Sequence, residues 1–248
     1  MRKESMDKVV YFTGCFSNYY DPEISKSLVY VMEKNGIEVI VPGQLCCGMP
    51  MMANANFKGA KRNYTKIVRS LYEASKGTYP IVTTCPSCNM MLKKEGKAFF
   101  PSEEAEYVSQ NIYDSSEFIV LLDLNNKLNK DFGRLELKVL YHNPCHLKVQ
   151  NIEATLYVLK LIPGIQVLGI NRDCCGMGGS FGMKKKNYPI SSAIGKKIWK
   201  MVEDLKPDGV VTECGGCGLQ ISSKTPIQIY HPMVLIKMAY SAAAQEAA

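Results

Sequence analysis

The ten cysteines of this 248-residue chain follow one spacing pattern that occurs twice. Each copy begins with a single cysteine, continues about thirty residues later with a Cys-Cys-Gly triplet, and ends with a Cys-x-x-Cys pair. The two sets are Cys15, Cys46, Cys47, Cys85 and Cys88, and then Cys145, Cys174, Cys175, Cys214 and Cys217. Matching positions lie 128 to 130 residues apart, which predicts two similar halves that each gather five thiols around a metal centre.

Composition supports a globular protein made of two domains. The chain is 46% hydrophobic and 21% charged, and its length suits two domains, which we place at residues 1–110 and 111–248. No apolar run is long enough to cross a membrane, and no secretory signal precedes Cys15, so we expect a cytoplasmic protein, with peripheral contact at the inner face of the membrane as the alternative. In such a reducing compartment, clustered cysteines favour metal or redox sites over disulfides. Aromatic residues are not interleaved with the basic ones, so the net charge of +7 does not indicate nucleic-acid binding.

Hydrophobic periodicity predicts strands that alternate with helices in both halves. The predicted strands cover residues 9–12, 38–41, 81–84, 137–141, 165–170, 209–212 and 227–230. The predicted helices cover 57–75, 115–124, 152–161 and 189–204, with further helices that begin at Pro22, Pro86 and Pro232. This order is typical of an α/β fold with two pseudo-repeated Rossmann-like halves and mostly parallel sheets. Every cysteine element directly follows a predicted strand, and the carboxyl ends of parallel strands are where such sheets bind ligands.

Thiolate is a soft ligand that selects zinc or iron–sulfur clusters. A zinc ion and an ordinary cubane cluster each need four ligands, so five cysteines exceed both requirements. Either one cysteine of each set is spare and reactive, or the centre is unusual and uses all five. Iron–sulfur ligation is the interpretation we favour, with structural zinc and a dithiol redox centre as the alternatives.

The cysteine pattern resembles the cysteine-rich CCG domain found in the B-subunit of heterodisulfide reductase and its relatives. The second half is also similar to the C-terminal part of the C-subunit of anaerobic glycerol-3-phosphate dehydrogenase. The stretches that carry this second resemblance are residues 141–147, 174–188 and 210–214, together with His231-Pro232. The resemblance covers nearly the whole chain.

The resemblance implies that each set of five cysteines binds one 4Fe-4S cluster, which in proteins like heterodisulfide reductase B is non-cubane and cleaves a disulfide. Other relatives relay electrons to membrane quinone, and zinc in one half is a further alternative. The implied partners are a flavoprotein and a ferredoxin-like iron–sulfur subunit, because this chain lacks the ferredoxin-type cysteine run of the glycerol-phosphate enzyme.

Three residues are candidates for a direct catalytic role. Cys174 and Cys175 form the second Cys-Cys pair, and His146 directly follows the ligand candidate Cys145. His146 is placed to donate a proton to a departing thiolate, although a histidine that only hydrogen-bonds the backbone is the simpler interpretation. The sequence defines no substrate pocket, and it leaves open the cluster type, the equivalence of the two halves, the stoichiometry of the complex and the direction of electron flow.

Overall fold

A computed structural model describes residues 6–246 and divides the chain into two compact units, Met1–Asn129 and Lys130–Ala248. The division falls later than the predicted one at residue 110. The reason is that strand β4 (Ile112–Asp114) pairs with strand β3 (Ile81–Thr83), and helix α7 (Ser115–Leu124) packs on both strands. We refer to the first and the second unit below.

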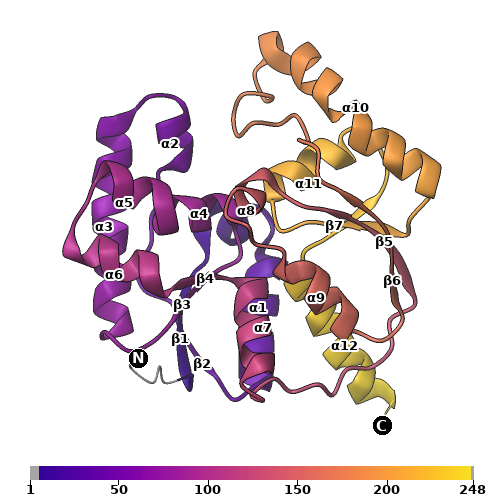
Figure 1. Cartoon of the computed structure of the whole chain (residues 1–248), viewed down its shortest axis with the longest axis horizontal. Helices are drawn as coiled ribbons and strands as arrows, with labels where there is room; N and C mark the ends of the chain where they lie inside the picture. Colours follow the sequence, from indigo (N-terminus) through magenta and orange to yellow (C-terminus); the bar gives the residue numbers. More distant parts are fainter. Residues whose placement is uncertain (1–5, 247–248) are drawn as a thin grey trace. The chain divides into compact units, whose positions relative to one another are not determined.

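The first unit is a four-stranded sheet in which all neighbouring strands are parallel (Figure 1). The strand order is β2 (Glu38–Ile40), β1 (Lys8–Phe12), β3 and β4. Helices α1 (Pro22–Lys34) and α7 cover one face, and α3 (Phe57–Ser75) and α6 (Glu103–Asn111) cover the other. The shorter elements are η1 (Phe16–Tyr20), α2 (Met49–Ala53), α4 (Pro86–Met90), η2 (Met91–Glu95) and α5 (Gly96–Phe99), of which η1 and η2 are π-helical.

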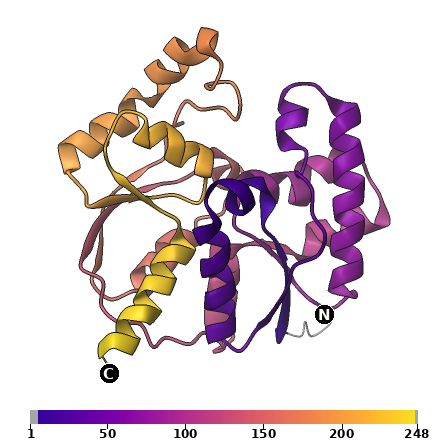
Figure 2. The same ribbon diagram turned by 180° about the vertical axis from the view of Figure 1, so that it is seen from behind.

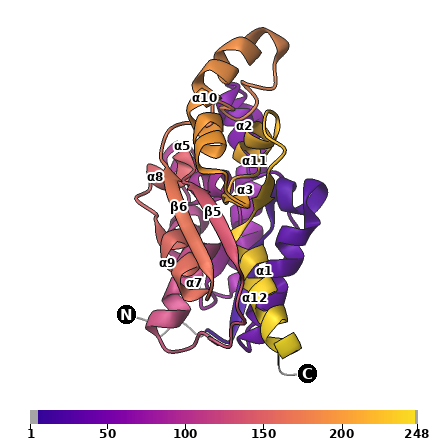
Figure 3. The same ribbon diagram turned by 90° about the vertical axis from the view of Figure 1, so that its right-hand side faces the viewer.

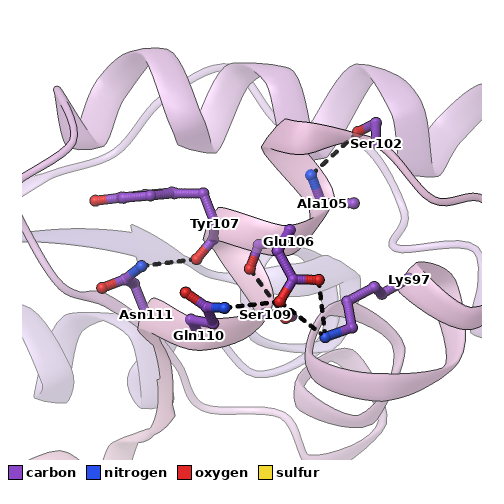
Figure 4. Close-up of polar contacts among 8 residues, drawn as sticks. All are labelled: Lys97, Ser102, Ala105, Glu106, Tyr107, Ser109, Gln110 and Asn111. Carbon is purple, nitrogen blue, oxygen red and sulfur yellow. Dashed lines mark hydrogen bonds and ion pairs between the residues drawn. The ribbon is translucent and has the colours of Figure 1, made fainter.

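Helix α6 and strand β4 lie in a region that the sequence patterns left without a predicted element. Ser102 caps the helix by accepting a hydrogen bond from the backbone N–H of Ala105 (Figure 4). On the exposed side, Glu106 forms an ion pair with Lys97 at 3.0 Å and accepts a hydrogen bond from Gln110 at 2.7 Å. Three acidic residues in the first turn also suit the positive end of the helix dipole.

The second unit repeats this topology. Its sheet is again fully parallel, in the order β6 (Ile165–Asn171), β5 (Leu137–His142), β7 (Gly209–Val211) and β8 (Gln228–Tyr230). The long strands β5 and β6 lie side by side in Figure 3. Helices α9 (Ala154–Leu161) and α12 (Pro232–Glu246) cover one face, and α10 (Tyr188–Leu205) and α11 (Gly215–Ser222) cover the other (Figure 2). Two short elements, α8 (Cys145–Lys148) and the 3₁₀ turn η3 (Lys185–Asn187), complete this unit.

The inner strands β1 and β5 are buried because helices cover both faces of each sheet. Val9, Val10, Tyr11 and Phe12 in β1 are fully buried, and so is the Val139–Tyr141 stretch of β5. Continuous apolar runs of this kind are expected for strands that are covered on both sides. The structure therefore confirms the predicted class, with two Rossmann-like halves and parallel sheets. Within residues 6–246, no helix combines the length and the apolar character that crossing a membrane requires.

Candidate metal centres

The five cysteines of the first unit, which we call the first sulfur group, lie just past the carboxyl ends of its strands. Cys15 follows β1, the pair Cys46-Cys47 follows β2, and Cys85 and Cys88 stand at the start of α4 after β3. Adjacent thiols form a continuous chain in which Cys46 lies beside both Cys15 and Cys47, and Cys88 lies beside both Cys47 and Cys85. Sheet topology thus brings together thiols that are up to 73 residues apart in sequence.

Contacts between these thiols raise the pKa of some of them and lower the pKa of others, so that some stay protonated and others are thiolates. Hydrogen bonds from the neighbouring Cys15 and Cys47 lower the pKa of Cys46 to about 2, while the pKa of each of those two partners is raised. A hydrogen bond from Cys88 likewise lowers the pKa of Cys85 to about 7, against the opposing effect of burial. Thiolate is the form that binds metals, so the first unit holds part of its sulfur group ready for ligation.

The second sulfur group occupies the same place in the second unit. Cys145 follows β5, Cys174-Cys175 follows β6, and Cys214 and Cys217 stand at the start of α11 after β7. Cys217 lies beside both Cys175 and Cys214, and its hydrogen bond to Cys175 lowers the pKa of that thiol to about 5. Burial and the neighbouring Cys174 raise the pKa of Cys145 to about 11.

Both Cys-Cys pairs turn at a glycine in the left-handed region. Gly48 has a φ of +95° and Gly176 a φ of +91°, values that side-chain-bearing residues rarely adopt. In the second unit the turned backbone points N–H groups at the sulfurs, with Gly176 donating to Cys174 at 3.3 Å and Met177 donating to Cys175 at 3.5 Å. These turns allow neighbouring cysteines to contribute to one site, as the sequence pattern predicts.

Two buried polar residues distinguish the second site from the first. His142, at the end of β5, takes the place that Phe12 has at the end of β1, and Glu213, just before Cys214, takes the place of Thr84. A ring nitrogen of His142 lies within 4.8 Å of the sulfurs of Cys175 and Cys217, which also lie within that distance of each other. His142 was not among the predicted site residues. The sequence did contain a signal for it, because His142 is a polar residue at a strand end whose counterpart in the first half, Phe12, is apolar.

Glu213 is fully enclosed and raises the polarity of this site. Its carboxylate accepts hydrogen bonds from Tyr141 and Thr155, and its other oxygen has no hydrogen-bond partner among the described residues. Burial raises the pKa of Glu213, and the hydrogen bonds from Thr155 and Tyr141 only partly oppose that effect.

The three predicted catalytic residues have different environments. Cys174 is exposed, and the next residue in the chain, Cys175, is buried. His146 lies in α8, where its backbone carbonyl accepts a hydrogen bond from the Gln150 side chain at 2.6 Å. The catalytic roles of these residues, and the ligand roles of the ten cysteines, stay predictions.

Several observations fit a thiolate-bound metal centre in each unit. All ten cysteines are free thiols, although each lies beside others of its group. Each unit also has a fully buried asparagine near its cysteines: Asn89 directly follows Cys88, and Asn143 lies two residues before Cys145. The amide nitrogen and oxygen of both asparagines lack hydrogen-bond partners within residues 6–246. Buried polar groups are normally satisfied, so these orphans are what a bound polar group would explain. Cys46, Cys85 and Cys175 supply the thiolate character that zinc or an iron–sulfur cluster needs.

Comparison with known proteins gives the same twofold division. A family model described as a cysteine-rich domain matches residues 9–93 and again residues 139–222. The chain is 34% identical over 242 residues to the C-subunit of anaerobic glycerol-3-phosphate dehydrogenase from Escherichia coli K12, a match that covers 94% of this chain and 59% of that protein. It is 32% identical over 251 residues to the B-subunit of fumarate reductase (CoM/CoB) from Methanothermobacter marburgensis, covering 94% of this chain and 47% of that protein.

A third relative carries iron–sulfur chemistry in its name. The chain is 29% identical over 220 residues to an uncharacterized iron-sulfur protein of Methanocaldococcus jannaschii, covering 86% of this chain and 41% of that protein. The chain therefore spans roughly half the length of these three relatives.

Proposed function

Because the chain belongs to the cysteine-rich CCG domain family and carries that domain twice, we propose that it is an iron–sulfur electron-transfer subunit of an oxidoreductase complex. Each unit holds one 4Fe-4S cluster, ligated by the first sulfur group in one unit and by the second in the other. The observation that carries this proposal is that five free thiols gather at the strand ends of each unit, each beside at least one other thiol of its group. Five ligands are one more than a cubane cluster takes, which favours a non-cubane centre.

The reaction we propose is the interconversion of a small disulfide and two thiols. Reduction of one disulfide consumes two electrons and two protons, and a bound iron–sulfur cluster supplies electrons one at a time. The chain's own residues would hold the centre at the end of each sheet and surround it with buried side chains. In the second unit, the backbone of the Cys-Cys-Gly turn donates hydrogen bonds to the sulfurs of Cys174 and Cys175. The 32% identity to the B-subunit of fumarate reductase (CoM/CoB) supports the general role of an oxidoreductase subunit.

The second candidate is a relay that passes electrons from a flavin dehydrogenase to membrane quinone. The 34% identity to one subunit of a glycerol-3-phosphate dehydrogenase favours it. In either case the partners are a flavoprotein and a ferredoxin-like subunit. The protein acts in the cytoplasm, and in the relay it binds peripherally at the inner face of the membrane.

Metal analysis of the anaerobically purified chain tests the proposal. Two clusters give about eight iron atoms and as much acid-labile sulfide per chain. Cys88→Ser and Cys217→Ser are each expected to remove about half of the iron, and Ser222→Ala, an exposed position on α11, is the control that retains all of it. Zinc in place of iron in protein never exposed to air refutes the redox function and leaves a structural role in assembly.

Turnover by the reduced, iron-loaded chain separates the two candidate reactions. Reoxidation of the clusters by a mixed disulfide of two small thiols, with release of both thiols, supports the disulfide reaction. Reoxidation by a short-chain quinone alone supports the relay.

A further inference from the structure

The second unit contains a nitrogen donor that its counterpart in the first unit lacks. We infer that His142 binds the metal centre of the second unit through Nε2, so that this centre has mixed sulfur and nitrogen ligands while the centre of the first unit has sulfur ligands only. The inference rests on the proposed function for the presence of a metal centre, and it goes beyond that function because it assigns unequal centres to the two units.

The first step concerns the orientation of the His142 ring. Nδ1 of His142 lies 2.8 Å from Oδ1 of Asn171. The Asn171 amide is oriented by its other contact, in which Nδ2 donates to the thioether sulfur of Met201 at 3.3 Å. A thioether has no proton to give and can only accept, so the amide oxygen must be the atom that faces His142. Nδ1 therefore carries the proton, and in the neutral ring Nε2 offers a lone pair.

The second step concerns what faces Nε2. His142 is fully buried, and no described residue meets hydrogen-bond geometry at Nε2, while the His142 ring lies close enough to Cys175 to help lower the pKa of that thiol. A ring nitrogen of His142 and the sulfurs of Cys175 and Cys217 are nevertheless grouped within 4.8 Å of one another. Donors of one tetrahedral metal lie about 3.6–3.8 Å apart, as follows from metal–ligand bonds of roughly 2.0–2.3 Å. The three donor atoms thus need only a small adjustment to share one metal.

The third step is the support behind the ring. A metal-binding histidine almost always donates its second ring N–H to an oxygen acceptor, which fixes the ring and strengthens the lone pair. Asn171 supplies that acceptor from the end of β6, the strand that pairs with β5 at His142. The first unit has no such arrangement, because Phe12 stands at the matching strand end and packs in the apolar core.

A mixed ligand set has a consequence for electron transfer. Imidazole binds as a neutral ligand where thiolate binds as an anion, and replacing thiolate by imidazole raises the reduction potential of an iron–sulfur centre.

His142→Asn is the variant that best separates metal binding by Nε2 from the structural role of the ring. An asparagine amide can reach the place of Nδ1 and retain the hydrogen bond to Asn171, but it has no atom at the place of Nε2. Phe12→Leu at the matching position of the first unit is the control, because it changes a buried apolar ring beside the other sulfur group. Far-UV circular dichroism and Trp199 fluorescence confirm that each variant is folded.

Two measurements on the full chain test the inference, and neither depends on activity. In the first, Co²⁺ is titrated into the reduced, metal-free protein. We expect His142→Asn to weaken one of two cobalt sites by at least about 10-fold and to shift its visible bands toward those of an all-thiolate site, because losing even a residue that only supports a metal ligand weakens binding about 10- to 100-fold. Phe12→Leu leaves that site unchanged.

In the second measurement, pulsed electron paramagnetic resonance is recorded on the iron-loaded chain with ¹⁵N-labelled histidine. A coupling of the size of directly bound imidazole, lost in His142→Asn, supports the assignment. Cobalt spectra identical in wild type and variant, or a loaded second cluster without such a coupling, overturn it. A chain that binds no iron but shows the nitrogen-dependent cobalt site refutes the proposed function and leaves this inference standing.

Discussion

Alanine substitution at Gly176 is the change for which the structure predicts the largest effect on the second site. The residue has a φ of +91°, and an added Cβ would come far closer than 3.0 Å to the backbone oxygen of Ser191 in α10. A left-handed backbone costs an alanine about 1–2 kcal/mol. Overlap with a backbone atom, which cannot rotate away as a side chain can, adds about 1–3 kcal/mol. We therefore expect Gly176→Ala to lower the free energy of unfolding by about 2–5 kcal/mol.

A neighbouring glycine separates the two contributions. Gly179 lies in the same loop with a φ of +61°, but an added Cβ there meets nothing within 4 Å. Gly179→Ala therefore carries only the backbone cost of about 1–2 kcal/mol. Gly48 in the first unit is intermediate, because its φ is +95° and an added Cβ would lie 3.3 Å from Ala60.

Urea denaturation of the reduced, metal-free chain measures these differences. Trp199, the chain's single tryptophan, is nearly buried in α10 and donates a hydrogen bond to the Gln220 carbonyl at 3.2 Å, so its fluorescence reports on the second unit. With a slope of about 2 kcal/mol per molar urea, Gly176→Ala should lower the Trp199 midpoint by about 1 M more than Gly179→Ala does. Equal shifts in the two variants would refute the steric argument, and circular dichroism follows Gly48→Ala in the same way.

Three further perturbations test the electrostatics and the helix capping. Burial raises the pKa of Glu213, so the stability that its protonated form contributes is fully present below its unfolded pKa of about 4.3 and declines as pH rises toward and through the folded value. Glu213→Gln should flatten this decline in urea midpoints of the metal-free chain measured from pH 5 to 8. An unchanged slope would contradict the assignment. The lowered pKa values of Cys46 and Cys175 predict that the folded, metal-free chain keeps thiolate absorbance near 240 nm at pH 6.5. Unfolding should abolish most of this absorbance, because a free thiol has a pKa of about 8.5, and serine at either position should remove part of it. Folded and unfolded spectra that coincide would count against the thiolates. Asp114→Ala breaks the buried capping box of α7 and should lower the free energy of unfolding by about 1–2 kcal/mol. Glu106→Ala removes exposed contacts on α6 and should leave the unfolding midpoint unchanged. Comparable losses of stability in both variants would show that burial does not determine the size of the effect.

Strong periodicity explains which elements could be predicted from the sequence. Helices α3 and α7 span the predicted residues 57–75 and 115–124, because each has a continuous apolar stripe and a defined start. The α6–β4 segment was missed because its apolar residues are few and β4 has only three residues, too short for an alternating pattern. The unit boundary moved from residue 110 for the same reason, since α7 belongs with the sheet that β4 completes.

The candidate site was predictable to the extent that strand order places residues. Cysteines that follow three parallel strands must meet at one edge of a sheet, so the spacing alone indicated both sulfur groups. The orientation of a buried ring is a different matter, because it depends on contacts from other strands. The position of His142 beside Cys175 and Cys217 depends on Asn171 and Met201, which come from β6 and α10. Only the folded structure shows that contact.

Each sulfur group comes from a single continuous stretch of chain, and this has a consequence for how the protein is made. Cys88, the last thiol of the first group, precedes Cys145, the first thiol of the second, by 57 residues. During synthesis the amino-terminal sheet can therefore form and collect its five thiols before the ribosome has delivered any of the other five. The two sulfur groups therefore become available for metal binding in sequence order, the first group before the second.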